Sequence, residues 1–278
     1  MKFLGADLHS HPAALLIGVP YDATSTFRAG SRHAPGAIRW ASQSIETFSP
    51  VLRRDLEDIA FGDEGDLHVE GMTPEAMVDT LASRIGALEA ATLPVIVGGE
   101  HTVTLGIVRA LAGRHRDLAV LQLDAHTDLR DEYEGRRVSH ATVMRRILDL
   151  VSPGSLVAAG IRAGTREEFL LSTGLRYSSH RLAIPPEVWT WLEARPVYVT
   201  IDIDVMDPAD APGTGNPEPE GVSAHELLTF VRRLEGLRVV GVDLVEVSPP
   251  YDPSGRTSVL AATILREAIL AITAPRPA

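Results

Sequence analysis

Six side chains with the chemistry of metal ligands are the most informative residues of this sequence. Four are carboxylates and two are imidazoles, and they occur in three separate segments: His101, Asp124, His126, Asp128, Asp202 and Asp204. In the second and third segments the ligands occupy alternate positions, so on an extended chain they share one face and can point at one site. A single catalytic cation that keeps one coordination position open takes fewer than six protein ligands. Six ligands suit a pair of cations. The pattern therefore predicts a two-metal hydrolase.

The ligand types also indicate which metals the site would prefer. Oxygen-rich sites with imidazole and no sulfur favour Mn²⁺, Mg²⁺, Fe²⁺ or Co²⁺, and two histidines make Mg²⁺ the least suitable of these. The sequence contains no cysteine, which excludes disulfides and thiolate-bound zinc. A pair of cations roughly 3.5–4 Å apart can acidify one water, so we expect hydrolysis at a carbon or phosphorus centre without a covalent intermediate.

Buried strands must position these ligands, and continuous apolar runs in the sequence predict them. Continuous rather than alternating runs are typical of strands that are covered on both faces, as in a parallel sheet. We expect strands at 15–19, 94–97, 118–123, 155–159, 197–203 and 237–245, a weaker one at 56–61 and a poor candidate at 175–184. Stretches with helical periodicity lie between them, at 73–88, 102–111, 140–150, 223–234 and 257–272. Another helix is expected to begin near Pro35.

This alternation of strands and helices predicts a single doubly wound α/β domain over residues 1–278. In open parallel sheets, ligands bind outside the carboxyl ends of the strands. Four of the predicted strands end in candidate functional residues: His101, Asp124, Asp202 and Glu246. Because these strand ends meet at one edge of the sheet, we expect their side chains to form one site. The last residues, Pro275–Ala278, are predicted to be a frayed tail.

Composition and charge argue against several classes of function. With 278 residues, of which 45% are hydrophobic, the chain can bury a large core. Its 26 basic and 37 acidic residues give a net charge of −11, which argues against a nucleic-acid partner and favours a cationic substrate or metal ions. No apolar stretch approaches the roughly 20 residues that span a bilayer, and no signal peptide is apparent, so we expect no membrane partner and a cytoplasmic protein.

Five motifs carry a resemblance to a known family: Gly98–Thr102, Asp124–Asp128, Ser139–His140, Ile201–Pro208 and Val245–Pro250. In combination they are similar to the signatures of the ureohydrolases, which include arginase, agmatinase and related guanidino- and formimino-hydrolases. The resemblance extends from about Ile17 to Ile272. It implies an arginase-like fold of three layers, α/β/α, with one mostly parallel sheet of about eight strands. It also implies assembly into a homo-oligomer, either a trimer or a hexamer.

The resemblance further implies a role for each functional residue. The six ligands would hold two Mn²⁺ per chain, and the family chemistry is attack of a bridging hydroxide on a guanidinium carbon, which releases urea and an amine. Asp128 is a candidate catalytic residue as well as a ligand. Glu246 matches the acidic residue that would hold the guanidinium by charge-assisted hydrogen bonds. His140 matches the proposed proton shuttle, because the leaving amine must take up a proton.

The segment after Asp128 favours agmatine over arginine as the substrate. Residues 129–139 contain no asparagine, whereas arginases carry a Ser-Gly-Asn type element there for the substrate carboxylate. Ser139–Thr142 is similar to the agmatinase pattern, with alanine at 141 where glycine is usual, and acidic residues at 131, 132 and 134 suit a cationic substrate. We therefore predict a metal-dependent amidinohydrolase that converts agmatine to putrescine and urea, within polyamine biosynthesis.

Three residues keep other guanidino substrates open. Arg136 and Arg137 could bind a carboxylate, as an arginase or another guanidino-acid or formimino hydrolase of the family would require. Asn216 stands where threonine is common in the family, so this edge of the pocket differs from the usual pattern. The sequence therefore leaves undecided whether the tail of the substrate carries an amine or an acid.

Two functions outside this chemistry fit part of the pattern. A dinuclear phosphoesterase would place basic residues near the metals, whereas Glu246 would repel an anion there. A non-catalytic metal-binding subunit would have lost a ligand, His140 or Glu246, and all of these are present. The sequence therefore favours the guanidino hydrolase over both.

Two segments outside the ligand motifs are predicted to have supporting roles. Asp243 lies on the strand that leads to Glu246, and we expect it to hydrogen-bond behind the metal ligands. The glycine-containing loop Asp22–Arg32 is similar to an entrance loop of the family. Its simplest role is to cap the helix that begins near Pro35.

Overall fold

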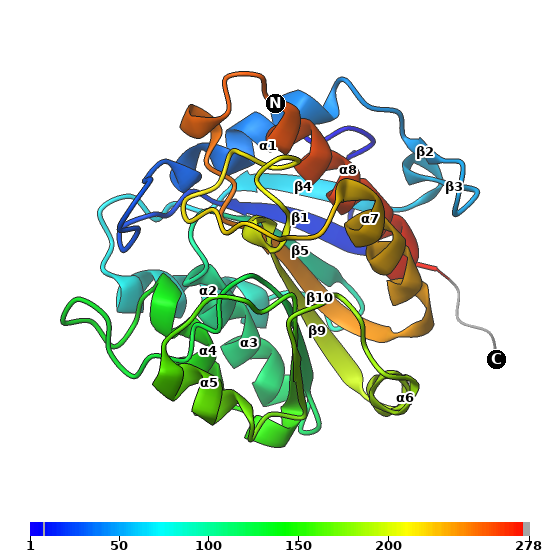
Figure 1. The fold of residues 1–278 in the computed structure, drawn as a ribbon. Helices are drawn as coiled ribbons and strands as arrows, with labels where there is room; N and C mark the ends of the chain where they lie inside the picture. Colours follow the sequence, from blue (N-terminus) through cyan, green and yellow to red (C-terminus); the bar gives the residue numbers. More distant parts are fainter. Residues whose placement is uncertain (8, 275–278) are drawn as a thin grey trace.

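Eight parallel strands form the central sheet of the computed structural model, which describes residues 1–7 and 9–274 (Figure 1). In chain order they are β1 (Ala14–Val19), β4 (Phe61–Asp66), β5 (Leu93–Gly98), β6 (Ala119–Leu123), β7 (Leu156–Ala159), β8 (Tyr177–Ser179), β9 (Pro196–Asp202) and β10 (Arg238–Val245). Their order in the sheet is β4-β1-β5-β10-β9-β6-β7-β8. A separate antiparallel pair consists of β2 (Phe48–Ser49) and β3 (Arg54–Asp55). The predicted tail, Pro275–Ala278, lies outside the described residues.

Helices cover both faces of the sheet, which confirms the predicted three-layer α/β/α fold (Figure 1). One face packs against α2 (Pro74–Gly86), α3 (Val103–Arg114) and α4 (Val143–Ile147). The other packs against α1 (Ala34–Ser42), α6 (Pro186–Glu193), α7 (Ala224–Arg232) and α8 (Arg256–Ile272). The remaining helix, α5 (Arg166–Ser172), follows β7. Among the described residues, no helix is both long enough and apolar enough to cross a membrane.

Local sequence explains where the helices begin. The Thr73 hydroxyl accepts a hydrogen bond from the Ala76 amide (3.3 Å), and Pro74 occupies the first turn of α2. Ser223 and Glu226 form a capping box at the start of α7. These contacts satisfy amide groups that the first turn of a helix cannot pair internally.

The predicted strand at 56–61 is wrong in position. Leu56–Asp58 forms a 3-10 turn, because the Asp55 carboxylate accepts a hydrogen bond from the Glu57 amide (3.1 Å) and closes the chain on itself. The strand, β4, begins only at Phe61 and contains three acidic residues, so its sequence resembles a turn. The predicted helix at 140–150 is also shorter: a 3-10 turn at His140–Thr142 precedes α4, which ends at Ile147.

The four central strands place the predicted ligands side by side. Strands β5, β10, β9 and β6 are consecutive in the sheet. Their parallel register aligns Val245 with Asp202, and Leu123 with Ile201. The segments that follow these strands therefore leave the sheet at the same edge, and at nearly the same height.

Candidate metal centre

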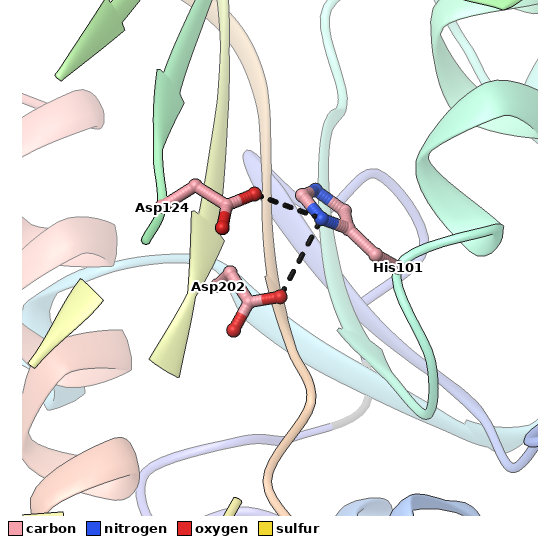
Figure 2. A group of neighbouring side chains, drawn as sticks. All are labelled: His101, Asp124 and Asp202. Atoms are coloured by element: carbon pink, nitrogen blue, oxygen red, sulfur yellow. Dashed lines mark ion pairs between the residues drawn. The ribbon is translucent and has the colours of Figure 1, made fainter. Parts of the chain in front are cut away.

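His101, Asp124 and Asp202 form the first of two groups in the described chain whose atoms could hold a metal ion (Figure 2). Nδ1 of His101 lies 3.2 Å from Asp124 Oδ2 and 3.5 Å from Asp202 Oδ2. Asp128 joins the same cluster, since its Oδ2 lies 3.1 Å from His101 Nδ1. All four residues are buried, and they come from the ends of β5, β6 and β9.

Asp124, His126 and Asp204 form the second group. Nδ1 of His126 lies 2.8 Å from Asp204 Oδ2 and 3.8 Å from Asp124 Oδ1. Because Asp124 belongs to both groups, the two candidate positions adjoin, as a two-metal site requires. The structure thus brings together all six ligands that the sequence predicts.

Hydrogen bonds behind His101 orient its ring as a metal ligand. Nε2 lies 2.9 Å from the Thr200 hydroxyl, whereas the buried Nδ1 has no hydrogen-bond partner in the part of the chain that the structure describes and faces the carboxylates. If Nε2 donates to Thr200, the lone pair of Nδ1 is free to bind a cation. Thr104 links Thr200 (3.3 Å between hydroxyls) to Asp243, whose carboxylate accepts from the Thr104 hydroxyl (2.7 Å). Asp243 therefore lies behind the ligands, as predicted, and acts through two threonines.

The electrostatics of the cluster call for positive charge. Burial, together with the Asp204 and Asp128 carboxylates, raises the pKa of Asp124 to about 7. Burial lowers the pKa of His126, but the Asp204 carboxylate and its neighbours outweigh this effect and raise the pKa to about 10. Divalent cations would supply the charge that these protons provide. Four buried carboxylates and two imidazoles, one of which has a buried Nδ1 without a hydrogen-bond partner among the described residues, therefore fit such ions.

The metal-free protein is expected to lose stability as the pH rises from about 4 to about 8. A carboxyl group whose pKa is higher in the folded state binds more protons there than in the unfolded state, so deprotonation favours unfolding. Asp124 contributes to this loss of stability up to a pH near its pKa of about 7, and Glu246 contributes up to a pH near its pKa of about 8. Each group can change the free energy of unfolding by a few kcal/mol, on the order of 1.4 kcal/mol per pKa unit.

Thermal unfolding of chelator-treated protein at several pH values tests this expectation. The unfolding temperature should fall across the range, and the fall should be smaller in an Asp124→Asn variant because one of the buried carboxyl groups is absent. Added Mn²⁺ should restore most stability at the higher pH values, where the carboxylates are ionised. An unfolding temperature that rises steadily with pH would contradict the proposed repulsion.

Two acidic residues of the site adopt left-handed backbone conformations. Asp128 has a φ of 52° and Glu246 has a φ of 63°, although neither is glycine. Such conformations cost on the order of 1–3 kcal/mol and persist where surrounding contacts hold them, often at functional sites. The Glu246 amide donates to the Gly99 carbonyl (2.8 Å), and its Oε1 accepts from the His101 amide (2.8 Å). Burial, followed by the charge of Glu100, raises the pKa of Glu246 to about 8.

A buried network that the sequence analysis did not predict holds His140. The Thr24 hydroxyl accepts from the His140 amide (3.1 Å) and lies 3.2 Å from His140 Nδ1. The same hydroxyl donates to Glu100 Oε1 (2.6 Å), and the Thr24 amide donates to Glu100 Oε2 (2.7 Å). Glu100 is fully buried, and Thr102 also donates to it (2.6 Å). Glu100 lies within the Gly98–Thr102 motif, and it was the feature of the sequence from which this network could have been predicted.

The loop Asp22–Arg32 has a second role beside the predicted capping. The Asp22 carboxylate accepts from the Arg32 amide (3.4 Å) in the 3-10 turn that leads into α1, so the loop does contribute to capping. Asp22 also closes the loop by accepting from the Gly30 amide (2.9 Å), and the loop brings Thr24 to His140. Helix capping alone would not have required a buried threonine.

A cavity of about 220 Å³ adjoins the ligands. Its wall includes His126, Asp128, His140, Arg130, Tyr133, Glu168 and Glu218. His126 is the most exposed of the six ligands, with 23% of its side chain accessible, so the site opens there. Arg136 and Arg137 do not line this cavity. A larger hollow of about 740 Å³, between the segment after β8 and α7, contains none of the ligands.

An open parallel sheet with carboxylates and histidines at the ends of its central strands defines a metal-dependent hydrolase. The model of the arginase family matches residues 12–271, and the chain belongs to this family. It is 42% identical over 263 residues to the agmatinase of Bacillus subtilis, with 92% of this chain and 91% of the relative covered. It is 39% identical to a guanidinopropionase of Pseudomonas aeruginosa over 301 residues, with 99% and 93% covered.

Solved structures agree with this assignment. A putative agmatinase from Clostridium difficile superposes with a TM-score of 0.91 and 36% identity, covering 95% of this chain and 98% of that one. The comparisons confirm the predicted ureohydrolase membership, the arginase-like fold and a metal-dependent amidinohydrolase activity.

Proposed function

We propose that the protein hydrolyses agmatine to putrescine and urea. The observation that carries this proposal is the position of Glu246, a buried carboxylate that hydrogen bonds fix beside the metal ligands. Its Oε2 faces Gly215, where the Cβ of a side chain would lie 3.3 Å away and crowd the carboxylate. Similarity to agmatinases over more than nine-tenths of the chain supports the same substrate.

In this proposal the six ligands hold two Mn²⁺ ions. His101, Asp128 and Asp202 would serve one ion, His126 and Asp204 the other, and Asp124 would serve both. When bound, such a pair lowers the pKa of water enough to supply a nucleophile near neutral pH. Cytoplasmic location, a role in polyamine biosynthesis and assembly into trimers or hexamers remain predictions.

The protein's own residues would orient the substrate and move the proton. Glu246 would hold the guanidinium by charge-assisted hydrogen bonds, and the cation would in turn favour the ionised form of this carboxylate. Asp128 lines the cavity beside the other ligands. It would bind a metal ion and would also restrict the orientation of the substrate. His140 would protonate the leaving amine; its ring is nearly perpendicular to that of Tyr133, with ring centres 5.7 Å apart.

Replacing Thr24 with valine is expected to reduce kcat by about tenfold or more, because His140 loses the hydroxyl that orients both its ring and its amide. General acid–base catalysis contributes roughly 10²–10⁴-fold, so partial misplacement should cost a fraction of that. Metal content should be unchanged, since Thr24 contacts none of the six ligands in the described contacts.

Steady-state kinetics over a range of pH, with metal content measured in parallel, would check this effect. Thr26→Val, in the exposed part of the same loop, is the matched control and should behave like the parent. A Thr24→Val enzyme with the parent's kcat and pH profile would contradict the positioning role of Thr24.

Urea release with Mn²⁺ tests the proposed function directly. Agmatine should give a higher kcat/KM than arginine, 4-guanidinobutanoate and 3-guanidinopropanoate, and formiminoglutamate should give no formamide. A preference for any of the acids would overturn the agmatinase assignment while leaving membership of the family intact. Hydrolysis of phosphate esters without urea release would instead revive the phosphoesterase alternative.

A further inference from the structure

We propose that Glu218 binds the positively charged end of the substrate and so selects guanidino compounds that carry an amine over those that carry an acid. This inference rests on the proposed function and identifies the residue that determines specificity for the substrate tail. Glu218 lies outside all of the ligand motifs and outside the segment 129–139, where the sequence places the discrimination.

Glu218 stands beside the metal centre without belonging to it. It lines the cavity next to the ligands, and its Oε1 lies 3.8 Å from Nε2 of His126. This separation is that of an ion-pair contact and is too long for a hydrogen bond, so both oxygens of the carboxylate can still accept hydrogen bonds from a ligand. With 39% of its side chain exposed, Glu218 faces the open part of the cavity rather than the protein interior.

The other charged groups of the cavity wall are already paired. Glu168 is buried and accepts hydrogen bonds from the Thr127 hydroxyl (2.8 Å), the Leu129 amide (3.1 Å) and the Thr165 amide (2.8 Å). Arg130 lies 3.4 Å from Glu168 Oε2, and its guanidinium packs over the Tyr133 ring at 4.6 Å. The arginine of the cavity wall, which could otherwise attract a carboxylate, is thus held by Glu168.

The two arginines considered for a carboxylate substrate lie elsewhere. Arg137 pairs with Asp131 at 3.5 Å on the exposed surface, and neither it nor Arg136 lines the cavity. The charge that remains available to a substrate tail is therefore the negative charge of Glu218. A primary ammonium group complements this charge, whereas a carboxylate would be repelled.

The loop that carries Glu218 also passes Glu246. Gly215 lies against Glu246 Oε2, and Glu218, three residues further on, lies against His126. Residues 215–218 thus extend along the site from Glu246, which would bind the guanidinium, to Glu218. A substrate with a positive charge at each end would meet an acid at each end of this loop.

Arg162 fixes the loop to the metal ligands. Its Nη2 donates to the carbonyl oxygens of Asp204 (2.7 Å) and Glu218 (3.0 Å), and its Nε donates to that of Pro219 (2.9 Å). The position of Glu218 relative to Asp204 is therefore set before substrate arrives. Such preorganisation lowers the cost of binding, because little chain must be ordered.

Kinetics with three substrates test the inference. For Glu218→Gln, kcat/KM for agmatine should fall about tenfold or more, mainly through KM, because a hydrogen bond to a charged group is lost. N-butylguanidine, which has the same chain length and no charged tail, should be hydrolysed within about twofold of the parent rate. Glu218→Lys should increase kcat/KM for 4-guanidinobutanoate relative to agmatine. The matched control is Glu220→Gln, which removes the same charge two residues away and outside this cavity.

Measurements of metal content and diamine binding separate the possible failures. If Glu218 instead orients His126, Glu218→Gln will lose metal and slow both agmatine and N-butylguanidine equally, and the inference is wrong. Unchanged agmatine kinetics would also overturn it. If the parent releases no urea from any substrate, the proposed function fails. Calorimetric titration with putrescine then still decides the inference, since the parent should bind it at least tenfold more tightly than Glu218→Gln.

Discussion

Replacing Asp124 with asparagine is expected to abolish binding of both metal ions and, with it, urea release. Asp124 is fully buried and is the one residue common to the two candidate metal groups. Removing a partner behind a metal ligand typically costs 10–100-fold in affinity, so losing a shared ligand should cost more than about 100-fold. Activity should fall by at least the same factor, because without metal ions the nucleophile is ordinary water.

The carboxylate at 124 also organises its surroundings. Its Oδ1 accepts a hydrogen bond from the His126 amide (2.6 Å), and its Oδ2 accepts from the Gln122 side chain (2.9 Å). Asparagine can accept at only one of these two positions. The second ligand group is therefore expected to lose its geometry as well as its charge.

Metal analysis after Mn²⁺ loading, together with urea release, checks the Asp124→Asn prediction. Asp117→Asn, just before the opposite end of β6, is the matched control and should retain two ions and full activity. Thermal unfolding of the metal-free variants distinguishes loss of the site from misfolding. Above the pKa of about 7 that burial gives Asp124, metal-free Asp124→Asn should be at least as stable as the metal-free parent, because the buried negative charge that it removes costs more than the one hydrogen bond that it loses. A variant with two ions and parental activity would refute the shared-ligand geometry.

Replacing Gly99 with alanine should lower the free energy of unfolding by about 3 kcal/mol or more and remove activity. A methyl group at 99 would lie 1.9 Å from the Tyr21 carbonyl oxygen. The two backbones cannot separate freely, because the Glu100 amide donates to that same oxygen (2.7 Å). On the other side, the Gly99 carbonyl accepts from the Glu246 amide (2.8 Å). Any movement that relieves the clash therefore displaces His101, Glu100 and Glu246 together.

Denaturant-induced unfolding measures the cost at Gly99, and the matched control is Gly113→Ala in α3. No atom outside the local chain lies within 4 Å of a Cβ at 113, so this change should stabilise the helix by up to about 1 kcal/mol. The two substitutions add the same methyl group and are expected to shift stability in opposite directions. Equal unfolding curves for Gly99→Ala and the parent would show that the close approach at Tyr21 is not maintained in solution.

The central strands were predictable because they are covered on both faces. All residues of β6 and β9 are buried, so their sequences are mostly apolar up to the predicted ligands, with Gln122 and Thr200 as exceptions. The edge strands were harder to identify, since each has one neighbour and partial exposure. β4 contains Asp63, Glu64 and Asp66, and β8 has only three residues, all partly buried.

Two helices escaped prediction for a related reason. α5 has seven residues, and its leucines Leu170 and Leu171 are 66% and 53% exposed. A helix this short, with apolar side chains in solvent, shows no periodicity that a sequence pattern could reveal. α6 is also short, with eight residues and a proline at its start.

The sequence by itself determined the candidate ligands and the edge of the sheet where they meet, because both depend on short-range order. Alternate positions on an extended chain set which side chains point together, and parallel strands bring their carboxyl ends to one edge. Tertiary structure alone decided which partners hold the predicted His140 and which acid lies beside His126. Thr24, Glu100 and His140 meet across separations of 76 and 116 residues, and Glu218 reaches His126 through a loop clamped by Arg162. Such contacts depend on how loops from different strands pack, and no local periodicity or spacing encodes that packing.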